Sequence, residues 1–206
     1  MAQLGREVRH RQSKTRGRSQ KRGRRFMIAW QAFSYAGVKY NLSHLHPRRV
    51  EILQPAKGEH PERTYAVQLI FGLHCFTRSA EAGEVIDPAL LYSDSRETRV
   101  FCLRRYRLSM LLPAIIDGLA GRPCYHTGKG NFFTVEVVDE QGTTQEYEVY
   151  FTASRATERG VLNLFVQSAD VRDGAHAGNR PKKRPIRLHV ILHNTLTNRP
   201  IKEPMR

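Results

Sequence analysis

The chain has 206 residues, 40% hydrophobic and 26% charged, a balance that excludes collagen, a coiled coil and wholesale disorder. Its 34 Lys and Arg residues outweigh 19 Asp and Glu residues, giving a formal net charge of +15. This excess of positive charge indicates a polyanionic partner.

The cysteine count and the N-terminus predict the compartment. Three cysteines are too few for a disulfide framework and favour a reducing environment. The long basic N-terminus is unlike a signal peptide, and the apolar run at 26–38 is too short to cross a bilayer. We therefore expect a cytoplasmic protein that makes no contact with a membrane.

Residues 1–25 differ in composition from the rest, with ten Lys and Arg residues against one acidic residue, a net of +9. They include too few apolar residues to fold alone, so a disordered or extended arm is predicted. The arm is either a solvated tail or an electrostatic contact that follows phosphates. Its candidate nucleic-acid contacts are Arg16, Arg18, Lys21, Arg22, Arg24 and Arg25.

Residues 26–98 are predicted to be rich in β-structure. Two short strands flank Ala36-Gly37, and a third strand is expected at 48–53. The apolar, aromatic run at 65–76 is typical of a strand buried on both faces.

The segment 99–119 shows the clearest helical spacing, because its apolar residues recur at intervals of three and four. If Ser109 caps the helix, Pro113 falls in the first turn, where proline is tolerated. A helix that begins near Val100 would instead be kinked at Pro113.

Four strands are expected after this helix, because polar and apolar residues alternate with period two. Together the elements predict an α+β fold, mainly antiparallel β-sheet with one principal packed helix. The expected parts are an arm at 1–25, a β-rich part at 26–98 and a helix with a four-stranded sheet at 99–206; alternatively, 26–206 form one domain. The four predicted strands are 132–138, 146–153, 161–169 and 186–193.

The open face of this predicted sheet carries groups suited to acid–base chemistry. Alternation places Arg187, His189 and His193 on one strand, and Glu148 and Tyr150 on another. Metal-independent RNA cleavage needs a base, an acid and a cation around the phosphate, and the pKa of histidine lies near neutral. The alternative is an ordinary polar face, in which Glu148 and Arg187 are cross-strand neighbours.

Further basic residues are candidates for phosphate contact. The 104–107 run surrounds Tyr106, which could stack on a base, although a solvated helix face explains the run equally well. Two glycines flank Lys129 and leave backbone amides that could cradle a phosphate. The candidates outside the arm are Arg104, Arg105, Arg107, Lys129, Lys182, Lys183 and Arg184.

Histidines and cysteines at 44–46, 74–75 and 124–126 would suffice for a zinc ion, but their spacing matches no zinc signature. Cys75 and Cys102 lie in apolar strings typical of a protein core. We therefore predict no metal site and no cofactor.

The order of one helix and four antiparallel strands over residues 100–195 resembles the barnase, EndoU, colicin and RelE-like nucleases of phages and toxins. The segments Tyr147–Thr152 and Leu162–Ala169 have the look of such domains. The resemblance is one of topology and implies metal-independent RNA cleavage by side chains on the sheet face.

The sequence therefore predicts a nucleic-acid-binding protein, with RNA favoured over DNA. Its sharper form is a toxin-like, metal-independent ribonuclease in which His189 transfers a proton, Arg187 stabilises the phosphate, and Glu148 or His193 is the partner. The alternative is a non-catalytic RNA- or DNA-binding module associated with the ribosome or nucleoid. A third possibility is an acidic protein partner.

Overall fold

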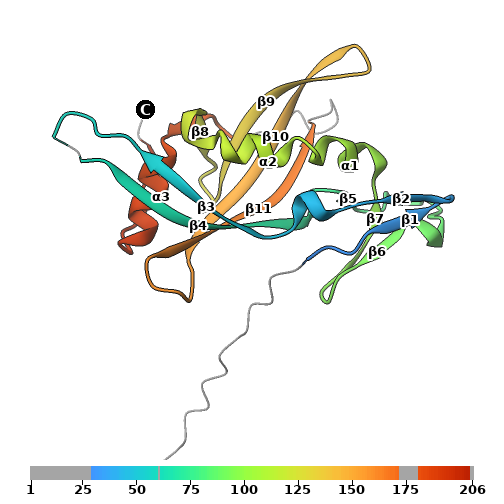
Figure 1. Ribbon diagram of the computed structural model, residues 1–206. Coiled ribbons are helices and arrows are strands. Elements are labelled where there is room, and N and C mark those ends of the chain that lie inside the picture. Colours follow the sequence, from blue (N-terminus) through green and yellow to red (C-terminus); the bar gives the residue numbers. More distant parts are fainter. Residues whose placement is uncertain (1–28, 60, 172–180, 205–206) are drawn as a thin grey trace, which may run out of the picture.

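The computed structural model describes residues 29–59, 61–171 and 181–204, and a seven-stranded β-sheet is its main element (Figure 1). The strand order is β12-β8-β9-β10-β11-β4-β3. Neighbouring strands are antiparallel, except that β11 and β4 run parallel. The strands are β3 (Arg48–Gln54), β4 (Arg63–His74), β8 (Cys124–His126), β9 (Phe132–Glu140), β10 (Thr143–Arg155), β11 (Val161–Val171) and β12 (Arg184–Ile186).

Smaller β-elements lie at one end of this sheet, on the right in Figure 1. A three-stranded sheet has the order β5-β7-β6, and β1 and β2 form a hairpin. The strands are β1 (Phe33–Tyr35), β2 (Val38–Tyr40), β5 (Thr77–Arg78), β6 (Leu91–Ser93) and β7 (Thr98–Phe101).

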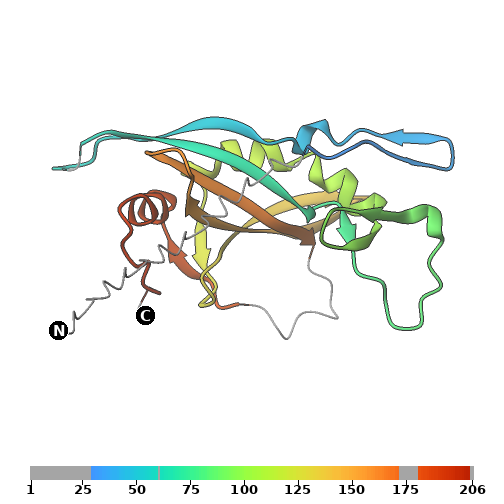
Figure 2. The ribbon, with the colours of Figure 1, turned by 90° about the horizontal axis from the view of Figure 1, so that it is seen from below.

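Three α-helices pack with the sheet, which is curled when seen from below (Figure 2). The helices α1 and α2 cross the sheet, and α3 lies at the end away from the small sheet (Figure 1). The helices are α1 (Leu103–Ser109), α2 (Leu112–Asp117) and α3 (Leu188–Leu196). Short 3₁₀ helices are η1 (Ser43–Leu45), η2 (Pro88–Leu90) and η3 (Leu119–Gly121).

Alternation along the strands builds the core. On β10, Tyr147, Val149 and Phe151 are fully buried and join one hydrophobic cluster with the buried residues of the helices. The same alternation recurs on β4, where every second residue from Tyr65 to Leu73 is buried. Burial of this apolar surface is the main contribution to the stability of the fold.

Aromatic side chains fill the end of the molecule that carries the small sheet. Phe33 and Phe101 stack with ring centroids 4.0 Å apart, and Trp30 packs edge-on against Phe76. Trp30 Nε1 also donates a 3.0 Å hydrogen bond to the carbonyl oxygen of Phe71 on β4, which joins this aromatic end to the main sheet.

Several expected elements are confirmed. The first hairpin turns at Ala36-Gly37, where both residues have positive φ. The strands expected at 48–53, 65–76, 132–138, 146–153 and 161–169 correspond to β3, β4, β9, β10 and β11. Strands from both 26–98 and 99–206 belong to the main sheet, since β4 pairs with β11.

The expectation of a mainly antiparallel sheet with one principal packed helix is wrong. The sheet is mixed, because β11 pairs with β4 in parallel, and three α-helices pack with it. The segment 99–119 is not one helix but β7, α1, α2 and the start of η3. Ser109 caps nothing: it is buried at the end of α1, and Pro113 lies in the first turn of α2.

The prediction of a fourth strand at 186–193 is also wrong, because this segment contains most of α3. Its apolar residues satisfy period two through Leu188, Val190 and Leu192, yet Leu188, Ile191 and Leu192 also have helical spacing. Packing decides between the two patterns. Ile191 is fully buried in the core, whereas Val190 is 37% exposed.

Candidate functional site

The predicted catalytic residues belong to two elements, the strand β10 and the helix α3. The two residues on β10 lie on the face of that strand that points away from the core. Glu148 and Tyr150 alternate with Tyr147 and Val149, which face the core that the buried residues of α3 share. Arg187, His189 and His193 belong to α3 or its N-cap. The single strand face that would have presented all five residues to one phosphate does not exist.

Glu148 and Tyr150 form a local pair. The Tyr150 hydroxyl donates a 2.7 Å hydrogen bond to Glu148 Oε2, and Glu148 is only 3% exposed. The Tyr150 ring stacks on Phe133, and Phe133 contacts Tyr125. This arrangement is a packed aromatic row on the outer side of the sheet.

His193 has a different environment, at the C-terminal half of α3. Its Nδ1 lies 2.7 Å from Nη1 of Arg63, the first residue of β4. Partial burial lowers the pKa of His193, and the positive charges of Arg63 and Arg199 lower this pKa further. The imidazole is therefore neutral at pH 7 and adds no charge to the two arginines beside it.

The predicted basic run on α1 is occupied by internal contacts. Arg104 Nε donates to Glu140 at 2.8 Å, and Arg107 approaches the same carboxylate at 3.9 Å. Arg105 pairs with Asp170 and also donates to two backbone carbonyls. These guanidinium groups hold α1 against β9 and β11, so they are structural contacts in this conformation.

The residues expected to contact phosphate near β12 are similarly engaged. Lys183 pairs with Glu146 at 3.2 Å and lies over the Tyr125 ring, and Arg184 pairs with Glu203 at 2.7 Å. Lys182 is exposed and makes no ion pair with any described residue.

The glycine loop around Lys129 does not offer the expected phosphate cradle. The amides of Gly128 and Lys129 donate to His126 Nδ1 and Thr127 Oγ1, at 2.8 and 3.1 Å. The Lys129 side chain itself is exposed. The six candidate contacts of the N-terminal arm, Arg16, Arg18, Lys21, Arg22, Arg24 and Arg25, lie outside the described residues.

A polar groove of about 470 Å³ lies between the end of β10 and the C-terminal end of α3. We call it the α3 groove; its lining residues are Ser154, Arg155, Asn194, Thr195, Asn198, Arg199 and Pro200. It is a shallow hollow that is widely open to solvent. Neither a carboxylate nor a histidine is among the lining residues.

A second hollow of about 680 Å³ adjoins it at the β10–β11 turn, and Arg155 lines both. We call it the turn hollow; it is lined by Arg155, Ala156, Glu158, Arg159, Gly160, Val161 and Leu196. Its carboxylate is already engaged, since Glu158 accepts hydrogen bonds of 3.1 Å from Arg49 on β3. That contact braces the turn against the edge strand β3.

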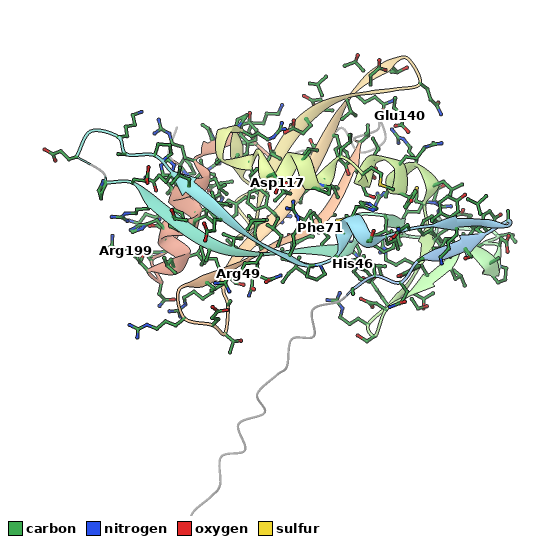
Figure 3. The ribbon with its side chains drawn as sticks, in the orientation of Figure 1. His46, Arg49, Phe71, Asp117, Glu140 and Arg199 are labelled. Carbon is green, nitrogen blue, oxygen red and sulfur yellow. The ribbon has the colours of Figure 1, made fainter. Side chains whose placement is uncertain are left out.

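Four exposed arginines gather at this end of the molecule: Arg63, Arg155, Arg159 and Arg199. None of them makes an ion pair with a described residue. Figure 3 shows Arg199 at this end, on the other side of the molecule from Glu140, which is the partner of Arg104. We call these four residues the arginine cluster.

Local conformation fixes two of these arginines. Arg155 ends β10, and Gly160, with φ of 83°, allows the chain to turn into β11. Asn198 has φ of 56° just after α3, and the Arg199 amide donates to the Asn194 carbonyl at 2.8 Å. The main chain therefore caps its own helix end, and the Arg155 and Arg199 side chains remain at the groove.

This arrangement is suited to binding anions that carry several oxygen atoms. A guanidinium presents five N–H donors in a planar fork that matches phosphate or carboxylate. Since like charges repel, an anion bound at the arginine cluster relieves that repulsion as well as accepting hydrogen bonds.

Comparison with known proteins identifies the family. The model of the YjaZ family matches residues 32–196. The chain belongs to the YjaZ family. It is 28% identical over 180 residues to Protein YjaZ of Escherichia coli (strain K12), an alignment that covers 86% of this chain and 96% of that protein. No solved structure matches the chain at a significant level.

The YjaZ family match includes Arg63, Arg155 and Arg159, and it ends two residues before Asn198. Sequence reasoning missed the arginine cluster because its members come from three separated segments and none lies in a basic run. The local signal was weak: Arg155 and Arg159 flank a turn between two alternating strands.

Metal ligation has no support within the described ranges, where no three His, Cys, Asp or Glu side chains converge. Burial raises the pKa of the Cys75 and Cys124 thiols to about 12, so both are inert core thiols at pH 7. Over the same described part of the chain, no helix is long and apolar enough to cross a membrane.

Proposed function

We propose that this YjaZ family protein binds nucleic acid through phosphate contacts at the α3 groove and the turn hollow. The observation that carries the proposal is that Arg155, Arg159 and Arg199 are exposed and lack any carboxylate partner within the described structure.

The contrast with other arginines supports a role in binding. Arg48, Arg78 and Arg122 each pair with a carboxylate on a neighbouring segment, as does Arg105. A guanidinium whose charge is already matched gains little from a phosphate, whereas an unmatched one gains both charge compensation and hydrogen bonds.

A polyanion fits better than a small anion, because the two hollows adjoin and share Arg155. A chain of phosphates can therefore run from Arg199 past Arg155 to Arg159. The net charge of +15, of which +9 belongs to residues 1–25, would add long-range attraction to the same ligand.

The proposal is for binding rather than cleavage. Of the residues expected to transfer protons, Glu148 is buried and accepts a hydrogen bond from Tyr150, and the α3 groove has neither a carboxylate nor a histidine in its lining. The resemblance to toxin-like nucleases stays a prediction, and the fourth strand on which it depended is part of α3.

The direct test is fluorescence anisotropy with a labelled single strand across a salt series. For the R155Q/R199Q variant we expect weaker binding and a salt slope smaller by about 1.4, since each lost contact to a single strand removes about 0.7. The matched control is K39Q, which removes from β2, at the other end of the molecule, an exposed charge that pairs with no described residue.

Equal losses in R155Q/R199Q and K39Q would contradict a localised site. Incubation of the full chain with RNA in EDTA, followed on a gel, addresses catalysis. We expect a shifted but intact band; discrete fragments would restore the ribonuclease hypothesis.

A further inference from the structure

The α3 groove carries hydrogen-bonding groups that the fold itself does not use. The Asn194 and Asn198 side chains and the Ser154 hydroxyl make no hydrogen bond to any described residue. Thr195 differs, because its hydroxyl donates to the Ile191 carbonyl at 2.8 Å. The groove therefore holds two unused carboxamides and a hydroxyl between Arg155 and Arg199.

These groups offer both donors and acceptors. A carboxamide presents an oxygen acceptor and two N–H donors, and a serine hydroxyl acts in both senses. A phosphate accepts hydrogen bonds but donates none when fully ionised, so arginines alone would satisfy it. The carboxamide oxygens can also accept from a ligand group that donates, in place of the water that reaches these exposed or half-exposed side chains.

The lining also lacks any aromatic side chain. Proteins that bind single strands without regard to the sugar place bases on aromatic rings within a basic groove. A groove of arginine, asparagine and serine cannot stack a base in that way. It is suited to the sugar–phosphate backbone.

We infer that the α3 groove recognises the ribose of single-stranded RNA, with Asn194 and Asn198 hydrogen-bonded to the 2′-hydroxyl and adjacent phosphates held by Arg155 and Arg199. The 2′-hydroxyl is both donor and acceptor, and it is the group by which a protein distinguishes RNA from DNA. This inference rests on the proposed function and assigns its ligand class.

A single strand fits this geometry better than a duplex. The carboxamides line a groove of about 470 Å³, which a flexible backbone can enter. In a duplex the 2′-hydroxyls are fixed on a wide, shallow minor groove, whereas a single strand can turn each ribose toward the side chains of the groove.

The experiment measures dissociation constants of the full chain for RNA, DNA and 2′-O-methyl RNA of one sequence. The N-terminal arm contributes through phosphates that all three share, so the ratio of RNA to DNA affinity isolates recognition of the sugar. We expect RNA to bind between about two- and tenfold more tightly than DNA, the range of one hydrogen bond. The 2′-O-methyl strand, which has lost the donor, should bind like DNA.

Two variants locate the contact. Asn198→Gly removes the carboxamide and keeps the positive φ that this position requires, and Asn194→Ala suits a helix. The double variant N194A/N198G should lower RNA affinity to the DNA value and leave DNA affinity unchanged. Thermal unfolding checks that the variant is folded.

The outcomes separate the inference from the proposed function. Equal binding of RNA and DNA by the unmodified chain overturns recognition of the ribose and leaves nucleic-acid binding standing. Absence of salt-dependent binding to either strand overturns both. A preference for RNA that survives in N194A/N198G also overturns the inference, because the selectivity would arise outside the α3 groove.

Discussion

Arg63 and His193 are in direct contact although they are 130 positions apart in the sequence, with Arg63 Nη1 2.7 Å from His193 Nδ1. The contact joins the first residue of β4 to α3 beside the arginine cluster. The contact favours the neutral form of His193, because Nδ1 accepts a hydrogen bond from the Arg63 guanidinium. A protonated Nδ1 could not accept that hydrogen bond.

The first prediction concerns the pKa of His193. Partial burial and the charges of Arg63 and Arg199 lower it, so R63Q should raise the pKa of His193 toward its ordinary value. The measurement is an NMR titration of the His193 ring. R49Q is the control, because Arg49 is paired with Glu158 and should leave this titration unchanged.

The same shift has a consequence for stability. The pKa values of His193 and His44 are both lower in the folded chain, so the unfolded chain binds more protons between the folded and unfolded pKa values. Their contribution to stability is present above pH 6.5 and is lost as the pH falls through the folded pKa values. Chemical denaturation between pH 7.5 and 5 should show it, and a flat profile for H44A/H193A supports the assignment.

A second prediction concerns the fully buried Tyr147, whose hydroxyl has no hydrogen-bond partner in the described structure. Because an unsatisfied buried hydroxyl costs free energy, Y147F should leave the free energy of unfolding unchanged or raise it by about 1 kcal/mol. Tyr65 is the matched control: it is also buried, but its hydroxyl donates to Gln54 Oε1 at 3.0 Å.

Loss of that bond in Y65F should lower the free energy of unfolding by about 0.5–1.5 kcal/mol. Urea denaturation measures both variants. A larger loss in Y147F than in Y65F would contradict the interpretation and indicate an ordered water molecule on the Tyr147 hydroxyl.

A third prediction concerns Gly72, where β4 passes very close to β11. A Cβ atom at this position would lie 2.8 Å from the Gln167 carbonyl oxygen, a backbone atom that cannot rotate away. G72A should therefore destabilise the protein by about 1–3 kcal/mol.

Gly121 provides the control for G72A, since a Cβ atom added there meets nothing within 4 Å. G121A should change the free energy of unfolding by no more than about 0.5 kcal/mol. Equal unfolding temperatures of G72A and G121A would contradict this prediction, because they would show that β4 and β11 can move apart without loss of stability.

Much of the sheet could be predicted because its strands have a local signature. Alternation in β9, β10 and β11 marks their buried face, as at Val149 and Leu164. The parallel pairing of β11 with β4 could not be predicted in this way, because alternation does not determine which strand lies beside another. The same limit applies to α3, where Leu188 and Leu192 satisfy both a strand and a helix.

The candidate site was less accessible to sequence reasoning. The dense basic runs were predicted to contact phosphate. In the structure, however, Arg104, Arg105 and Arg184 pair with carboxylates from other segments of the chain. Arginines without such partners among the described residues, such as Arg155 and Arg199, are isolated in the sequence. A charge is available for a ligand only if the fold brings no opposite charge to it, and this is a property of tertiary contacts.

The sequence by itself determined the net charge of +15, the basic composition of the arm and the alternating faces of the long strands, because these depend on residue type and local spacing. Only the tertiary structure decided that 188–196 is a helix, which arginines are neutralised, and where the α3 groove lies. Those outcomes depend on packing and charge pairing between residues more than a hundred positions apart, such as Arg49 with Glu158 and Arg63 with His193.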